Sequence, residues 1–133
     1  MTATNVERVR EVYEHWSRGD WRFTADWFGD DAVYTTFDAD GEEIVLEGAD
    51  EMGRWFRGFL EQWRDFRQEM HELIDCGDRV LAVGRQFATG RASGAELDMR
   101  VYNVWVFRDG RLAELLVTRH EGAALRKAGI NVR

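Results

Sequence analysis

The chain has 133 residues, 44% of them hydrophobic, and a formal net charge of −7 at pH 7, which suits one folded domain and excludes a disordered chain. The arginines are scattered among an excess of acidic residues, so no basic surface for nucleic acid is predicted. No apolar run approaches the roughly 20 residues of a membrane span, and the N-terminus lacks the basic and apolar regions of a signal peptide. We therefore expect one cytoplasmic domain over residues 1–133, with no membrane or nucleic-acid partner.

The first half of the chain predicts three helices. The first begins at a capping box, in which Thr4 and Glu7 each satisfy a backbone N–H at the helix start. A short second helix is expected between Asp20, as its cap, and Gly29, as its end. The third helix has the clearest signal, an apolar residue at each position of one helical face: Met52, Trp55, Phe56, Phe59, Leu60 and Trp63.

Strands are expected wherever β-branched and aromatic residues lie between turn residues: 32–37, 43–46, 66–74, 79–89, 96–107 and 111–119. Short turns separate the last four, and antiparallel pairing follows because a parallel crossover needs a dozen or more residues. One of these turns contains Cys76, the single cysteine, which cannot form an internal disulfide. A closing helix over 121–128 ends at Gly129. The pattern predicts an α+β domain with its helices on one face of the sheet.

Four segments make the chain recognisable through their turns. They are Arg18–Asp20 followed by Trp27–Val33, then Asp75–Val80, Val104–Leu112 and Ala123–Ile130. In this order they resemble the "GD … LFADDAV", "D-x-GDRV", "VWxFRDGKI" and terminal-helix motifs of the SnoaL-like, or ketosteroid-isomerase-like, family in the nuclear transport factor 2-like superfamily. The resemblance covers nearly the whole chain.

The resemblance implies a cystatin-like cone, in which a strongly curved, mostly antiparallel sheet wraps round the N-terminal helices and encloses a deep cavity. It also implies a homodimer. Members include isomerases, polyketide cyclases, dehydratases, epoxide hydrolases and plain binding proteins, so the fold leaves the function open.

The positions at which relatives carry catalytic groups hold other residues here. By alignment on the turns, the steroid isomerase's general base falls on Thr36 and its oxyanion-hole acid on Asn103. The last-strand aspartate of cyclases and epoxide hydrolases falls on Val117. The oxyanion tyrosine falls on Val12, with Tyr13 one place away and turned about 100° round the helix. No carboxylate remains at these positions.

Three residues are candidate catalytic groups. Asn103 alternates with apolar residues and is predicted to point inward, either as a ligand-orienting donor or as a satisfied core amide. Tyr13, or alternatively Tyr34, can donate a phenolic hydrogen bond to a ligand oxygen. His120 titrates near neutrality and can move a proton, although it also stands where the last helix starts.

Six tryptophans and eight phenylalanines are more large rings than a small core needs, and some can form a cavity wall. Arg119 is expected near the cavity mouth, where it either pairs with a substrate carboxylate or enolate or keeps its charge in water. The candidate lining residues are Trp16, Trp27, Tyr34, Thr36, Trp55, Phe59, Trp63, Met99, Val101, Trp105, Val117 and Arg119. The histidines lack zinc-like spacing, so no metal and no cofactor are expected.

Three functions therefore remain open. The first is a cofactor-independent isomerase, cyclase or dehydratase acting on a hydrophobic or polycyclic carbonyl compound. The second is a binding protein for a small apolar molecule, without catalysis. The third is a dimerisation module whose aromatic residues fill the cone.

Overall fold

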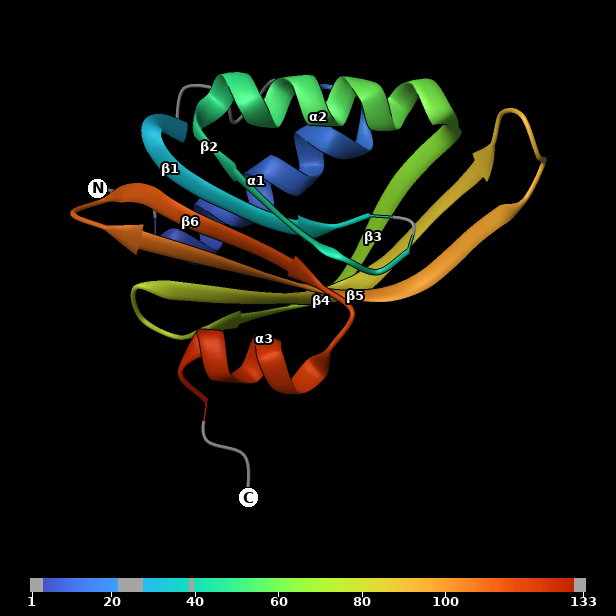
Figure 1. Cartoon of the computed structure of the whole chain (residues 1–133). Coiled ribbons are helices and arrows are strands. Elements are labelled where there is room, and N and C mark those ends of the chain that lie inside the picture. Colours follow the sequence, from blue (N-terminus) through green and yellow to red (C-terminus); the bar gives the residue numbers. More distant parts are fainter. Residues whose placement is uncertain (1–3, 22–27, 39, 131–133) are drawn as a thin grey trace.

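One sheet holds both halves of the chain together. The computed structural model describes residues 4–21, 28–38 and 40–130. In this part of the chain the elements are, in order, α1 (Asn5–Ser17), β1 (Phe28–Phe37), β2 (Glu43–Glu47), α2 (Gly48–Gln62), β3 (Trp63–Asp75), β4 (Arg79–Gly90), β5 (Glu96–Arg108), β6 (Arg111–Thr118) and α3 (Glu121–Ala128) (Figure 1).

The sheet has six strands in the order β2-β1-β6-β5-β4-β3. Strands β3 to β6 form the antiparallel meander that the short turns predict. The N-terminal hairpin of β1 and β2 joins through a parallel pairing of β1 with β6. The predicted α+β class with a curved, mostly antiparallel sheet is therefore confirmed.

The helices cover both faces of the sheet, which corrects the expectation of one face. Helices α1 and α2 lie on one side and α3 on the other (Figure 1). Residues Val9 and Val12 of α1 pack in one core cluster with Trp105. Ala124 of α3 packs in a second cluster, whose sheet residues are Leu81, Tyr102, Val104 and Val106. Successive residues of a strand point to opposite faces, so these apolar residues of β4 and β5 need a cover of their own.

The ends of two predicted elements are also wrong. Most of the second predicted helix falls on residues 22–27, outside the described part of the chain, but Gly29 does not end a helix because β1 already begins at Phe28. Phe28 pairs with Leu112 of β6, a contact that no local pattern encodes. Trp63 was expected inside the third helix, yet its backbone is extended and begins β3, where it pairs with Gly90.

The predicted capping box is present at the start of α1. The Thr4 hydroxyl accepts a hydrogen bond from the Glu7 backbone N–H at 3.1 Å, and the Glu7 carboxylate accepts one from the Thr4 N–H at 3.2 Å. We expect Thr4→Ala to lower the free energy of unfolding by about 1 kcal/mol and the melting temperature by roughly 3 °C. Thermal melting checks this. Glu7→Gln is the control, because an amide can still accept the return bond; an equal loss in both variants would contradict the cap assignment.

Candidate functional site

The hydroxyl of Tyr13 lies at the centre of a buried polar group between α1 and the sheet. It accepts a hydrogen bond from Asn103 Nδ2 at 2.7 Å and a second from Trp105 Nε1 at 2.9 Å. Both donors lie on β5 and, two residues apart, point to the same face. The Tyr13 ring also packs edge-on against Trp16 and Trp105, with centroids 5.6 and 5.8 Å apart. These contacts fix the tyrosine above the middle of β5.

Amide groups extend this polar group across the sheet. Gln86 Nε2 donates a hydrogen bond to Gln68 Oε1 at 3.2 Å, and Asn103 Nδ2 lies 3.5 Å from the same oxygen. Gln68 and Gln86 face each other across the β3–β4 pairing. Among the residues joined in this way there is no carboxylate and no histidine. The group can donate and accept hydrogen bonds but offers no general base.

Burial keeps the interior phenols protonated. Desolvation raises the pKa of Tyr13 well above its usual range, more than the hydrogen bonds from Trp105 and Asn103 lower it. Burial also raises the pKa of Tyr34 to about 12, against a smaller lowering by its hydrogen bond with Thr36. A phenol has one proton and an oxygen that accepts two hydrogen bonds. Since the Tyr13 oxygen already accepts two, its remaining capacity is the donation of its own proton.

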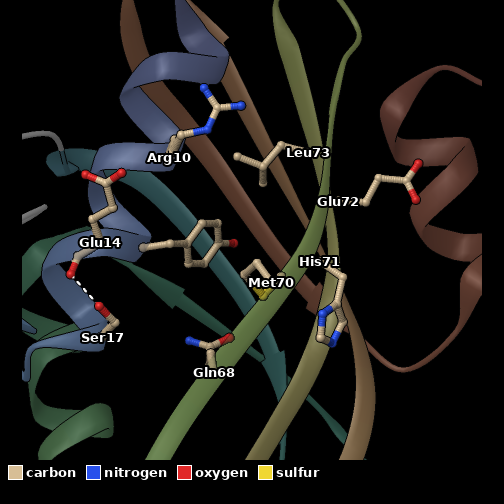
Figure 2. A pocket seen from close by; sticks show the side chains of 9 residues that line it. Arg10, Glu14, Ser17, Gln68, Met70, His71, Glu72 and Leu73 are labelled. Atoms are coloured by element: carbon tan, nitrogen blue, oxygen red, sulfur yellow. Dashed lines mark hydrogen bonds between the residues drawn. The ribbon is translucent and has the colours of Figure 1, made fainter.

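A pocket of about 350 Å³ opens beside Tyr13, between α1 and β3 (Figure 2). Its size lies at the lower end of the roughly 300–1,000 Å³ of small-molecule sites. Its walls are Arg10, Tyr13, Glu14 and Ser17 of α1 and Gln68 with residues 70–73 of β3. Two members of the polar group, Tyr13 and Gln68, thus reach a space that a ligand can enter.

Comparison with known proteins decides the family. Residues 9–115 match the family model of the SnoaL-like domain. The chain belongs to the SnoaL-like family. Among curated proteins, none matches it.

Several solved structures share the SnoaL-like fold of this chain. An NTF2-like protein from Burkholderia thailandensis is 24% identical, with a TM-score of 0.80 over 98% of this chain and 100% of that one. An NTF2-like protein from Burkholderia pseudomallei is 22% identical, with a TM-score of 0.76 over 94% of this chain and 97% of that one. A proposed polyketide cyclase from Sinorhizobium meliloti is 22% identical, with a TM-score of 0.65 over 87% and 95%. At these identities the likeness shows the fold.

Two of the three candidate catalytic residues lie together in this SnoaL-like chain. Asn103 is 1% exposed and donates to Tyr13. Val12, on which the alignment placed the family's oxyanion tyrosine, is fully buried in the core, and the hydroxyl of the neighbouring Tyr13 is the group that contacts Asn103. His120 has an exposed side chain just before α3, and its backbone N–H donates to Thr118 Oγ1. None of its described contacts reaches Tyr13 or Asn103.

Six of the twelve predicted lining residues are aromatic side chains that pack on other rings, and all but the fully buried Trp105 are half-buried. Tyr34 packs on Trp55, Trp55 stacks on Phe59, and Phe59 stacks on Trp63, at centroid distances of 6.0, 5.5 and 6.2 Å. Trp16 packs on Trp105 at 5.8 Å, and Trp21 and Phe56 link it to Phe59. Trp27 lies outside the described residues.

The remaining predicted lining residues are buried or half-buried, with the exception of Arg119. Thr36, Val101 and Val117 are buried, and Met99 is half-buried. Arg119 is exposed, and its guanidinium lies 5.1 Å from the centroid of the Phe37 ring. Of the predicted site residues that the structure describes, only Tyr13 lines the pocket between α1 and β3.

Two buried polar atoms lack a partner within the described part of the chain: Trp16 Nε1 and Asn103 Oδ1. Buried polar atoms are rarely unpaired in proteins, so such atoms mark places where a ligand or water can bind. Oδ1 shares a carbon atom with Nδ2, which binds Tyr13, so this free acceptor lies near the free proton of the tyrosine.

Neither a membrane span nor a metal site is evident in the described elements. No helix there is long and apolar enough to cross a bilayer. No group of three or more histidine, cysteine, aspartate or glutamate side chains is placed there to hold a metal ion.

Proposed function

We propose that this protein binds a small, uncharged, mainly apolar carbonyl compound, whose oxygen accepts a hydrogen bond from Tyr13. The observation that carries the proposal is the Tyr13 hydroxyl itself. Its oxygen accepts two hydrogen bonds, none of the described hydrogen bonds uses its proton, and the residue lines a pocket. A phenol is a neutral donor at physiological pH, and burial moves the pKa of Tyr13 further above it.

A cofactor-independent isomerisation, cyclisation or dehydration is the second candidate function. A neutral phenol that donates to a carbonyl oxygen also stabilises the negative charge of an enolate at that oxygen. The described interior supplies no carboxylate as base, since Thr36, Asn103 and Val117 stand at the family's positions. A base for this chemistry would come from the pocket rim, where Glu14 and His71 lie. The homodimer that the resemblance implies stays a prediction.

A matched pair of aromatic ligands tests the proposal. Acetylnaphthalene carries a carbonyl group, and ethylnaphthalene has nearly the same shape without it. We expect the ketone to bind more tightly, and Tyr13→Phe to weaken its affinity roughly tenfold, the effect of losing one hydrogen bond. Ethylnaphthalene affinity should not change. Tryptophan fluorescence titration measures both, and a ligand at a hundred times its dissociation constant also stabilises the fold by about 2.7 kcal/mol.

The control is Tyr102→Phe, the same change on the opposite face of the sheet, where the hydroxyl contacts Glu121 at 2.9 Å. It should leave both affinities unchanged. Equal affinity of the unmodified protein for the two ligands, or no binding of either, would sink the proposal.

A further inference from the structure

Gln68 is held in one orientation by two donors. Its Oε1 faces Gln86 Nε2 at 3.2 Å and Asn103 Nδ2 at 3.5 Å. An amide carries its acceptor oxygen and its two N–H donors on one carbon atom. With the oxygen turned towards two donors, the Nε2 hydrogens point away from them, and none of the described hydrogen bonds uses them.

Gln68 and Tyr13 border the same pocket. Both residues line it, one from β3 and one from α1. Asn103 Nδ2 lies within hydrogen-bond distance of both, at 2.7 Å from the Tyr13 oxygen and 3.5 Å from the Gln68 oxygen. Asn103 thus bridges the two side chains, which border the same pocket.

The rest of the pocket selects the class of ligand. Met70 and Leu73 of β3 give it an apolar wall, as Figure 2 shows from close by. Charged side chains at its α1 edge are Arg10 and Glu14, whose charges offset each other, while the Glu72 side chain points away from α1 (Figure 2). The pocket therefore has no excess of positive charge for an anionic ligand, whereas an uncharged carbonyl oxygen has two lone pairs for two donors.

We infer that Gln68 is a second donor to the ligand's oxygen, so that the pocket between α1 and β3 holds a ketone, enone or quinone oxygen with the pair Tyr13 and Gln68. The inference rests on the proposed carbonyl binding and adds to it Gln68 as a second donor and the pocket between α1 and β3 as the position of the oxygen. Two neutral donors hold an oxygen without an acidic side chain, and they stabilise negative charge that develops on it.

The substitution Gln68→Glu separates the donor role from a structural one. The glutamate keeps an oxygen for Gln86 and Asn103 but replaces the amide nitrogen with a second acceptor. We expect the affinity for acetylnaphthalene to fall at least tenfold, because a hydrogen bond is lost and two acceptors then face each other. The affinity for ethylnaphthalene should stay within about twofold. Gln62→Glu, the same change on an exposed residue at the end of α2, is the control and should alter neither.

The infrared carbonyl stretch of the bound ketone gives a second, direct measurement. Each hydrogen bond moves this band to lower frequency, so the unmodified protein should give the lowest value. Tyr13→Phe and Gln68→Met should each give an intermediate value, one donor being left in each. The Tyr13→Phe measurement leaves Gln68 in place, so it remains informative even if the Gln68 variants fold poorly.

The results distinguish the two proposals. A band in Tyr13→Phe at the frequency of the ketone in an apolar solvent, or full ketone affinity in Gln68→Glu, overturns the role of Gln68 and leaves the Tyr13 proposal standing. A protein that does not prefer the ketone over ethylnaphthalene overturns both.

Discussion

Between pH 10 and pH 12 we expect the free energy of unfolding to fall steeply. Burial raises the pKa of Tyr34 from 10.0 to about 12, and it raises the pKa of Tyr13 in the same direction. Below pH 10 both states hold these protons, so the stability is complete. Above it the unfolded chain loses its phenolic protons while the folded chain retains them, which favours unfolding.

The expected slope is about 1.4 kcal/mol per pH unit for each of these tyrosines. For Tyr34 alone, the free energy of unfolding should be lower by roughly 2–3 kcal/mol at about pH 12, where the pKa of the folded state lies. This is a large part of the 5–15 kcal/mol typical of a domain. Urea unfolding followed by far-ultraviolet circular dichroism at a series of pH values measures it. Circular dichroism is preferred to tryptophan fluorescence here, since tyrosinate changes the fluorescence itself.

Tyr34→Phe is the informative comparison, because phenylalanine keeps the ring and removes the titrating group. The free energy of unfolding of this variant should decline less steeply with pH, because the contribution of Tyr34 to the slope is removed. In the double variant with Tyr13→Phe the decline should be smaller again. Curves that run parallel to that of the unmodified protein would show that neither hydroxyl is buried as described.

Local patterns predict the elements well and their ends poorly. The capping box at Thr4 and the apolar stripe from Met52 to Phe59 lie within single helices, where spacing in sequence sets spacing in space. The start of β1 at Phe28 and the place of α3 depend on pairing and packing with residues far along the chain. Such contacts leave no periodic trace in the segment itself.

The candidate site was predictable where side-chain direction follows from strand alternation. Asn103 was placed inward on this ground, and it is buried. Tyr13 is a candidate donor beside Tyr34, one place from the aligned position Val12, and the rotation of α1 against the sheet, which the sequence does not specify, brings its hydroxyl to Asn103.

Gln68 was missed because glutamine on a strand carries no signal of burial. Strand β3 also shifts its register between Met70 and Glu72, so alternation counted from Arg67 fails beyond that point. Strict alternation along β3 would put Met70 and Leu73 on opposite faces of the sheet. The shift instead lets Met70 and Leu73 both line the pocket.

The same irregularity predicts that Gly84→Ala is among the most damaging single substitutions in the chain. Gly84 of β4 pairs with Met70 of β3, beside the register shift. A Cβ added to it would overlap the Glu69 carbonyl oxygen and lie 2.7 Å from Met70 Sδ and 2.8 Å from its Cα. Two of these atoms belong to the backbone, which cannot move aside as a flexible side chain can.

We expect Gly84→Ala to lower the free energy of unfolding by about 3 kcal/mol, the upper range for overpacking, and the melting temperature by roughly 10 °C. Gly58→Ala on α2 is the matched control. A Cβ there meets nothing within 4 Å, so the better helix propensity of alanine should stabilise the protein by up to about 1 kcal/mol. The two substitutions should change the free energy of unfolding in opposite directions, because one added methyl group meets backbone atoms and the other meets open space.

This substitution also joins stability to the site. If β3 moves away to accommodate the methyl group, Met70 and the nearby Gln68 move with it, and the wall of the pocket opposite Tyr13 is displaced. Acetylnaphthalene should then bind more weakly to any Gly84→Ala protein that remains folded, while Gly58→Ala binds it normally. A Gly84→Ala protein with full stability and full ketone affinity would show that β3 lies further from β4 than described, and the placement of Gln68 in the pocket would have to be withdrawn.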